Sequence, residues 1–245
     1  MSTAAPSTVS RLRDLPVRGG FLQALAQRVL IYDGSMGATL IDLNPSAEDY
    51  GGPAYLGCQD YLVLTAPQII EPLHASFMEV GCDVLETNSF QASRHRLAEW
   101  GLADQTYAIN HAAAALARRV ADRFATPDHP RFVAGSIGPT GMLPSSDDPA
   151  LSAITYQQLV AIFHEQAKAL VEGGADVLII ETQQDILETK AAINGCVRAF
   201  HELGYRVPIH ASVSLDISGR MLLGTDIAAV LTTLEALPID VIGLN

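Results

Sequence analysis

Cysteine is scarce in this sequence, and the few that occur are scattered. Cys58, Cys82 and Cys196 are the only three among 245 residues. An odd number of cysteines spaced so widely does not predict a disulfide framework. The sequence also lacks any Cys-x-x-Cys pair, which excludes the spacing of a zinc finger. We therefore expect three buried or chemically inert thiols.

Positive charge is scarce as well. The 15 Lys and Arg residues stand against 27 Asp and Glu residues, and the net charge is −12. Such an acidic surface repels phosphate backbones, so we expect no nucleic-acid binding and no attraction to anionic membranes. No apolar run is long enough to predict a membrane span. Residues 1–20 lack the apolar middle of a secretory signal and predict a disordered lead-in, which favours a cytoplasmic location.

Signature motifs of several enzyme classes are missing. The sequence has no Gly-x-Ser-x-Gly elbow, no P-loop and no His-x-x-x-His pair, which removes support for a serine hydrolase, an NTPase or a zincin. Its two lysines, Lys168 and Lys190, fall in predicted helices. This placement counts against an aldolase-like lyase with a catalytic lysine at a strand end.

Short apolar runs alternate with longer amphipathic segments along the chain. Near-continuous apolar runs predict parallel strands at residues 28–32, 82–86, 131–135, 176–180, 207–213 and 239–243. Periodic segments predict helices at residues 67–80, 105–124, 155–172, 186–203 and 226–237. The order is therefore a repeated strand–helix unit.

Loop lengths distinguish the two architectures that this order allows. The turns before strands are short (80–83 and 173–176), whereas long loops follow strands at 44–61 and 138–152. This asymmetry predicts an α/β fold of the (β/α)8 TIM-barrel type. The alternative is a doubly wound sheet. Its first strand is typically followed by a Gly-x-Gly-x-x-Gly turn, which residues 33–37 do not provide. About six βα units are present, so we expect residues 21–245 to form a C-terminally truncated barrel with open edges.

Polar residues follow the predicted strands at one end of the sheet. Asp33, Glu86 and Glu181 would meet there without an obvious cation, and clustered carboxylates repel unless a cation joins them. A metal or an ammonium group would serve. An α-amino acid fits well, with its ammonium on Asp33 and Glu181 and its carboxylate on the Gly34 and Ser35 amides.

Purely structural roles are the alternative interpretation of these residues. Asp33-Gly34 is a common turn, Glu86 suits a helix cap, Asn88 suits an Asx turn, and Gly138-Pro139 suits a rigid loop. The seven histidines, Trp100 and the segment 94–96 are expected to be structural or surface residues. Glu181 favours function, because it follows five apolar residues at the mouth of a buried strand.

Five motifs in this order resemble the homocysteine S-methyltransferase family. They are Asp33-Gly34-Ser35-Met36-Gly37, Glu86-Thr87-Asn88-Ser89-Phe90, residues 135–140, residues 178–182 and Gly243-Leu244-Asn245. The resemblance extends from about Val29 to Asn245. Residues 60–67 and 169–176 favour the N-terminal homocysteine-binding domain of cobalamin-dependent methionine synthases.

The resemblance implies a (β/α)8 barrel that transfers a methyl group to homocysteine and forms methionine. The substrate-binding residues that it implies are Asp33, Gly34, Ser35, Thr87, Asn88 and Glu181. The pocket-supporting residues that it implies are Glu86, Gly138, Pro139, Thr140, Thr182 and Asn245. Asn88 and Asn245 are similar to residues that surround the thiolate and the metal in the family.

The resemblance also implies cofactors and partners. The family's zinc activates the thiol and is held by three cysteines, whose positions would lie beyond Asn245, so no metal ligand is expected in this chain. Methylcobalamin would be the methyl donor, served by cobalamin- and folate-binding domains of a longer protein. Related enzymes use S-methylmethionine or betaine. An amino-acid-binding fragment without turnover is the remaining alternative, and we expect the isolated chain to be inactive.

Overall fold

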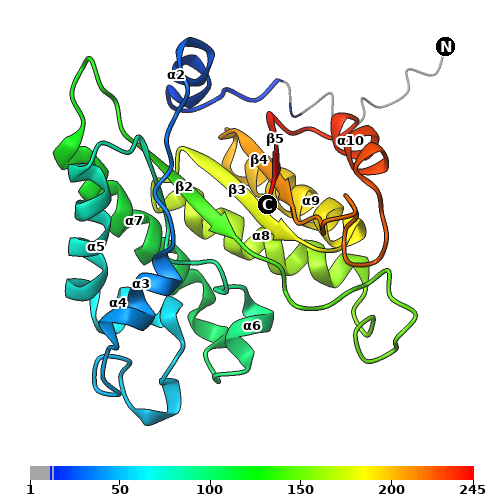
Figure 1. Ribbon diagram of the computed structural model, residues 1–245, viewed down its shortest axis with the longest axis horizontal. Helices are drawn as coiled ribbons and strands as arrows, with labels where there is room; N and C mark the ends of the chain where they lie inside the picture. Colours follow the sequence, from blue (N-terminus) through cyan, green and yellow to red (C-terminus); the bar gives the residue numbers. More distant parts are fainter. Residues whose placement is uncertain (1–11, 13) are drawn as a thin grey trace.

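A five-stranded, all-parallel sheet forms the centre of the molecule. The computed structural model describes Leu12 and residues 14–245. The strands are β1 (Val84–Glu86), β2 (Phe132–Ile137), β3 (Val177–Gln183), β4 (Ile209–Val213) and β5 (Val241–Leu244). They pair in the order in which they occur along the chain. A doubly wound sheet would reverse this order at a switch point, so the structure has the winding of a β/α barrel (Figure 1).

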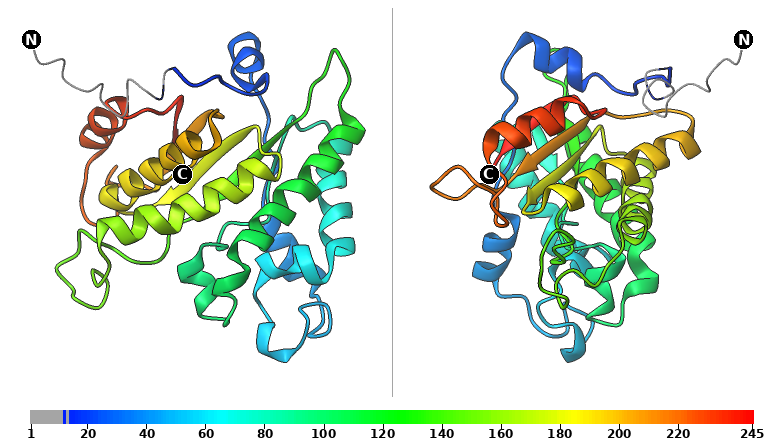
Figure 2. Two further views of the ribbon diagram at one scale, coloured as in Figure 1. Left: turned by 180° about the vertical axis from the view of Figure 1, so that it is seen from behind. Right: turned by 90° about the vertical axis from the view of Figure 1, so that its right-hand side faces the viewer.

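Helices cover the convex face of the sheet (Figures 1 and 2). The covering helices are α5 (Pro67–Glu79), α7 (Thr106–Phe124), α8 (Tyr156–Glu172), α9 (Ile186–Leu203) and α10 (Ile227–Glu235). All five were predicted from sequence periodicity to within about two residues at each end, the usual uncertainty of a helix boundary. The helix α8 starts where the sequence requires it, because Thr155 and Gln158 form a capping box.

Short elements occupy the connections between the larger ones. They are α2 (Phe21–Gln27), α3 (Met36–Leu43), α4 (Leu62–Thr65), α6 (Arg94–Ala98) and the 3-10 turns Pro53–Tyr55, Gln59–Tyr61 and Ala103–Gln105. The predicted loop 44–61 therefore contains two turns of helix. Within the part of the chain that the structure describes, no helix has the length and apolar character needed to cross a bilayer.

The prediction of a regular strand at residues 28–32 is wrong. Only an isolated parallel bridge joins Tyr32 to Val84. The Ile31 amide donates to the Asp83 carboxylate at 2.8 Å, where a ladder would need a backbone acceptor. The segment has β1 on one side only, and Val29 and Ile31 are exposed. A single neighbour and a competing side-chain acceptor reduce this strand to an edge segment.

Two apolar cores lie on opposite faces of the sheet. On the convex face, Leu85, Val133 and Leu178 pack against the helices. On the concave face, Val84, Ala134, Val177 and Ile179 form a second cluster with Phe21, Leu30 and Phe132. This alternation follows from the period of two along each strand. The helix α2 closes the concave face at its amino end, and the carboxyl end is left to the long loops (Figure 1).

Three aspartates at the starts of strands hold the amino end together. They are Asp83, Asp176 and Asp240. Each accepts a hydrogen bond from a backbone amide of the neighbouring strand segment, and these amides belong to Ile31, Val133 and Ile209. Each also pairs with an arginine, respectively Arg28, Arg118 and Arg206. The short turns that end in Asp therefore fix the register of neighbouring strands.

Asp83→Asn should lower the free energy of unfolding at neutral pH by about 1.5–3 kcal/mol, the range for a charged hydrogen bond. Burial opposes ionisation of Asp83, but hydrogen bonds from Arg28, the Ile31 amide and His129 outweigh it and hold the pKa of Asp83 well below its usual range. A depressed pKa stabilises the fold above the unfolded value of about 3.9 and loses that effect as the pH falls. Urea unfolding between pH 7 and pH 3 should therefore show a shallower acid loss in the variant. Parallel curves for variant and wild type would contradict this role.

The structure describes only part of the lead-in predicted at residues 1–20. Residues 1–11 and 13 lie outside the described residues. Val17 forms an isolated parallel bridge with Arg206, and the Arg18 amide donates to the Arg206 carbonyl at 2.8 Å. The end of this segment therefore packs along the start of β4.

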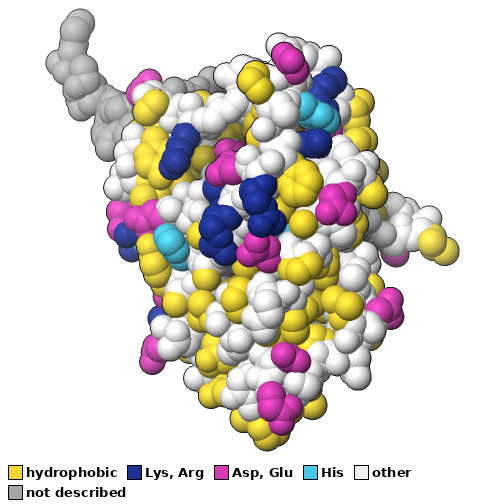
Figure 3. Space-filling model, turned by 90° about the vertical axis from the view of Figure 1, so that its left-hand side faces the viewer, with side chains coloured by type: hydrophobic (Ala, Val, Ile, Leu, Met, Phe, Trp, Pro, Cys, Tyr) yellow, Lys and Arg dark blue, Asp and Glu magenta, His cyan; other side chains and the backbone are white. Residues whose placement is uncertain are grey.

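Arginines gather on the face formed by α5 and α7 (Figure 3). They are accompanied by acidic groups: Arg123 lies 2.6 Å and Arg119 lies 3.9 Å from the Glu71 carboxylate. Arg118 lies 2.8 Å from Asp122 on the same helix. These basic side chains are therefore neutralised in pairs within the face that carries them.

Candidate active site

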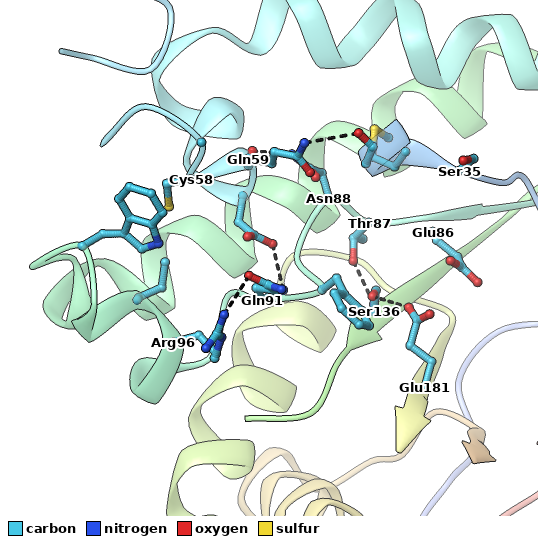
Figure 4. A pocket seen from close by; sticks show the side chains of 17 residues that line it. Ser35, Cys58, Gln59, Glu86, Thr87, Asn88, Gln91, Arg96, Ser136 and Glu181 are labelled. Atoms are coloured by element: carbon cyan, nitrogen blue, oxygen red, sulfur yellow. Dashed lines mark hydrogen bonds between the residues drawn. The ribbon is translucent and has the colours of Figure 1, made fainter. Parts of the chain in front are cut away.

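A cavity of about 450 Å³ opens at the carboxyl ends of β1, β2 and β3 (Figure 4). This volume lies in the range of small-molecule sites. Its wall consists of Ser35, Met36, Gly37, Gly57, Cys58, Gln59, Asp60, Glu86, Thr87, Asn88, Phe90, Gln91, Arg96, Leu97, Trp100, Ser136 and Glu181. The sequence-predicted residues on this wall are Ser35, Glu86, Thr87, Asn88 and Glu181.

Glu181 reaches the cavity through an irregularity in β3. The register between β3 and β4 shifts between Ile180 and Gln183. Thr182, within this shift, has a φ of 58°, a left-handed conformation that is costly for a β-branched residue. The Asn245 side chain donates to the Thr182 hydroxyl at 3.0 Å. Thr182 and Asn245 therefore lie behind Glu181 and hold the distorted strand end.

Glu86 and Glu181 place two carboxyl groups on one side of the cavity. The Ser136 hydroxyl donates to Glu181 at 2.6 Å. Burial, followed by the charges of Glu181 and Asp33, raises the pKa of Glu86 to about 8. Burial likewise raises the pKa of Glu181, although hydrogen bonds from Ser136 and Thr182 oppose this shift. The site therefore carries an excess of acidic groups, which favours a cationic ligand.

Asp33 is close to this site but its carboxyl group lies inside the wall. The side chain is only 2% exposed. One oxygen accepts the Glu86 amide at 2.9 Å, and the other lies 3.8 Å from Nδ1 of His74. Asp33 therefore fixes the end of β1 and adds negative charge behind Glu86.

The turn after Asp33 reaches the cavity wall at Ser35. Gly34 is exposed, and Ser35 has a φ of 49° immediately before α3. Left-handed serine is uncommon and points to a constrained turn. Ser35 contributes to the cavity wall, whereas Gly34 lies outside the lining.

Thr87 and Asn88 are positioned by hydrogen bonds to neighbouring loops. The Thr87 hydroxyl accepts the Ser136 amide at 2.9 Å and shares a 2.6 Å hydrogen bond with Ser89. The Asn88 amide donates to the Gln59 carbonyl at 2.8 Å. Both residues are buried, and both contribute polar atoms to the same cavity wall.

The predicted supporting residues 138–140 hold the loop after β2 and do not line the cavity. The Gly138 amide donates to the Phe90 carbonyl at 3.0 Å. Both the amide and the hydroxyl of Thr140 donate to the buried carboxylate of Glu188, at 2.8 and 2.5 Å. Pro139 joins these two anchor points.

Several residues that line the cavity were not predicted from the sequence. Arg96 and Trp100 were expected on a solvated helix face, but both line the cavity, because the short helix α6 ends beside the loop 57–60. Asp60 is buried and accepts the Gln91 amide at 3.0 Å. The segment 60–67, noted above for its family resemblance, was the only available signal for Asp60. Gln59 and Gln91 offered none.

The described residues do not fit a zinc site. They contain no group of three His, Cys, Asp or Glu side chains placed to hold a metal ion. Cys58 lines the cavity, but Cys82 and Cys196 are buried elsewhere. Burial raises the pKa of all three thiols, to about 12, 11 and 12 respectively, whereas zinc binds the thiolate.

This arrangement can bind a small polar molecule with a cationic group. The two glutamates and Ser136 supply acceptors at one end, and Arg96, Trp100 and Leu97 form the other end. Ser35 also lines the cavity, and backbone amides in a turn of this kind are donors suited to a carboxylate. An α-amino acid has the charges that this distribution requires.

Known proteins resemble the chain in sequence. Methionine synthases from Mycobacterium leprae (strain TN) and Mycobacterium tuberculosis (strain ATCC 25618 / H37Rv) are each 38% identical to it over 224 residues, which is 91% of the chain. The chain spans 18% of the length of these relatives.

Solved structures show the same fold. The metallated form of the homocysteine methyltransferase MmuM from Escherichia coli superposes with a TM-score of 0.74 at 21% identity, over 93% of this chain and 78% of that one. Its oxidized form gives the same TM-score at 22% identity, over 91% and 76% of the two chains. The sequence profile of the family described as Homocysteine S-methyltransferase matches residues 30–245. The chain therefore belongs to the homocysteine S-methyltransferase family.

Proposed function

We propose that this chain binds homocysteine in the cavity beside Glu86 and Glu181 and presents its thiol for methyl transfer, which yields methionine. The observation that carries the proposal is the pair of glutamates in a cavity of a homocysteine S-methyltransferase family member. No arginine or lysine among the described residues lies within 4.0 Å of either carboxylate. The ammonium group of an amino acid would supply the missing positive charge.

Each end of the substrate has a proposed partner. Glu181 would accept hydrogen bonds from the ammonium group, and Asp33 would add negative charge from behind Glu86. The Gly34 and Ser35 amides would meet the carboxylate. Thr87 and Asn88 would supply polar contacts along the substrate. Thr182 and Asn245 would act through Glu181, because they hold the strand end that carries it.

The thiol needs activation that the described residues do not provide. A free thiol has a pKa of about 8.5 and is mostly protonated at neutral pH. Family resemblance implies zinc for this task, but the described residues offer no zinc ligand set, so we derive no step through a metal here. Methylcobalamin is the proposed donor, because the relatives are methionine synthases. Cobalamin- and folate-binding domains would then belong to the remaining length of such a protein.

Glu181→Gln should weaken homocysteine binding by roughly 10- to 100-fold, the equivalent of a charged hydrogen bond of about 1.5–3 kcal/mol. Asp33→Asn should weaken it less, because Asp33 acts through charge from inside the wall. Isothermal titration calorimetry of the 245-residue chain with homocysteine measures both effects.

The controls are Glu79→Gln and Asp42→Asn, which remove exposed carboxylates on α5 and α3. Both should bind homocysteine as the wild type does. A wild-type chain without measurable affinity would contradict the proposed binding function. Equal affinity in wild type, Glu181→Gln and Asp33→Asn would contradict the assigned roles. Binding without methionine formation from methylcobalamin would indicate an amino-acid-binding unit that depends on other parts of a longer protein for turnover.

A further inference from the structure

Glu86 of β1 and Glu181 of β3 both line the cavity, and Ser136 of the intervening strand β2 lies beside Glu181 (Figure 4). The Ser136 hydroxyl donates to Glu181 at 2.6 Å, and the Thr182 side chain also stabilises the ionised form of Glu181. Among the described residues, the Glu86 carboxyl group has neither a hydrogen bond nor an ion pair. The two carboxyl groups are thus half-buried in one cavity wall, and no Arg or Lys among the described residues lies within 4.0 Å of either.

The neighbouring titratable groups do not compensate this charge. Asp33 adds a further acidic group and faces His74 of α5 at 3.8 Å. On the concave face, His210 of β4 has a buried Nδ1 without a partner among the described residues, and burial lowers the pKa of this histidine, which keeps it neutral. Cys82 and Tyr32 can only contribute negative charge. Burial, then Glu86, Asp33 and Glu181, raise the pKa of the Tyr32 phenol, so it stays protonated.

The basic residue of the cavity wall, Arg96, lies at the other end of the cavity and is already hydrogen-bonded there. Arg96 donates to Glu99 at 2.6 Å and to Gln91 at 3.3 Å. Asp60, also at that end, is buried and accepts the Gln91 amide. The glutamate end therefore has no positively charged partner in the described part of the chain.

We infer that the carboxyl pair Glu86 and Glu181 carries one proton when the cavity is empty and releases it when a ligand ammonium group binds. The inference rests on the proposed function, because it takes the ligand to be an amino acid. It assigns Glu86, which sequence resemblance suggests only as a support, a direct part in ligand recognition.

The physical reason is that two carboxylates in one partly buried cavity wall, without a cation beside them, cannot both ionise cheaply. The first to ionise raises the pKa of the other, and the pair titrates in two steps that belong to both groups. A pKa of about 8 for Glu86 agrees with a proton retained at neutral pH. A ligand ammonium neutralises part of the charge, both groups ionise, and the proton passes to solvent.

The proton balance fixes the direction of the pH effect. Below about pH 8 the empty site carries the proton and the occupied site does not. Affinity for the ammonium form of an amino acid should therefore rise with pH by up to about tenfold per unit, and the rise should level off near pH 8. L-Homoserine is the suitable probe, because it lacks a thiol and its binding cannot release a thiol proton.

The first test needs no ligand. The 245-residue chain, with 13C-labelled glutamate carboxyl groups, is titrated by NMR. We expect a glutamate step near pH 8 that disappears in Glu86→Gln and moves to lower pH in Glu181→Gln. Glu188, whose pKa is raised to about 7 by burial, is distinguished because its step persists in both variants. If every step that Glu86→Gln or Glu181→Gln abolishes lies near the ordinary value of about 4.3, the shared proton is refuted.

The second test measures proton release. Calorimetry with L-homoserine at pH 7, in buffers of different ionisation enthalpy, should give close to one proton released by the wild type and by Glu79→Gln, and almost none by Glu86→Gln. Binding without proton release in the wild type would overturn the inference while leaving amino-acid binding intact. A wild-type chain that binds neither homoserine nor homocysteine fails the proposed function, and the NMR titration then still decides the shared proton.

Discussion

Gly138→Ala is expected to lower the free energy of unfolding by about 2–4 kcal/mol, which combines overpacking of about 1–3 kcal/mol with one lost hydrogen bond of about 1 kcal/mol. A Cβ at Gly138 would lie 2.7 Å from two ring carbons of Phe90 and closer still to the Phe90 carbonyl oxygen. That carbonyl accepts the Gly138 amide. The loop after β1 and the loop after β2 would have to separate for the methyl group to fit.

The same change should disturb the cavity, because Phe90 and Gln91 belong to its wall. Urea unfolding followed by circular dichroism measures the loss of stability, and homocysteine calorimetry measures the effect on the site. Gly20→Ala is the matched control: a Cβ there meets nothing within 4 Å, and Gly20 lies at the start of α2 and outside the cavity wall. Equal stability of Gly138→Ala and Gly20→Ala would show that the two loops are free to separate.

The sequence predicted the five long helices and five of the six strands well, because each carries a local signal. The helix α9 has its stop at Gly204, which adopts the left-handed conformation expected of a C-terminal glycine. The strand at 176–180 is a continuous apolar run and corresponds to β3. The failure at residues 28–32 has a non-local cause. Whether an apolar run forms a ladder depends on its neighbours, and here Asp83 takes the Ile31 amide.

The site was predictable only where residues follow strands directly. Glu86 and Glu181 lie in the cavity wall, as their positions at strand ends suggest. Asp33 also follows an apolar run, yet its side chain turns toward His74 and the Glu86 amide. Arg96 lies in α6 and Trp100 just after it, and the position of this helix depends on packing between distant loops. Such packing leaves no periodic trace in the sequence.

Both outer edges of the sheet lack a pairing partner on one side. The segment 28–32 pairs with β1 only, and β5 pairs with β4 only. Apolar side chains are exposed at both places: Val29 is 77% exposed, Ile31 57% and Leu244 61%. Unpaired strand edges with apolar side chains offer a template for pairing with another chain.

The 245-residue chain by itself should therefore associate, with a mass of at least a dimer in light scattering at micromolar concentration. The double variant Val29→Lys/Ile31→Lys should shift it toward the monomer, because charged side chains at an edge oppose pairing of strands. Neither side chain contributes to the described cores, so the folded state should survive, which circular dichroism checks. Val80→Lys is the matched control, since Val80 is 84% exposed but follows α5 and belongs to neither edge segment. A monomeric wild type, or an equal shift in the control, would show that the open edges do not drive association.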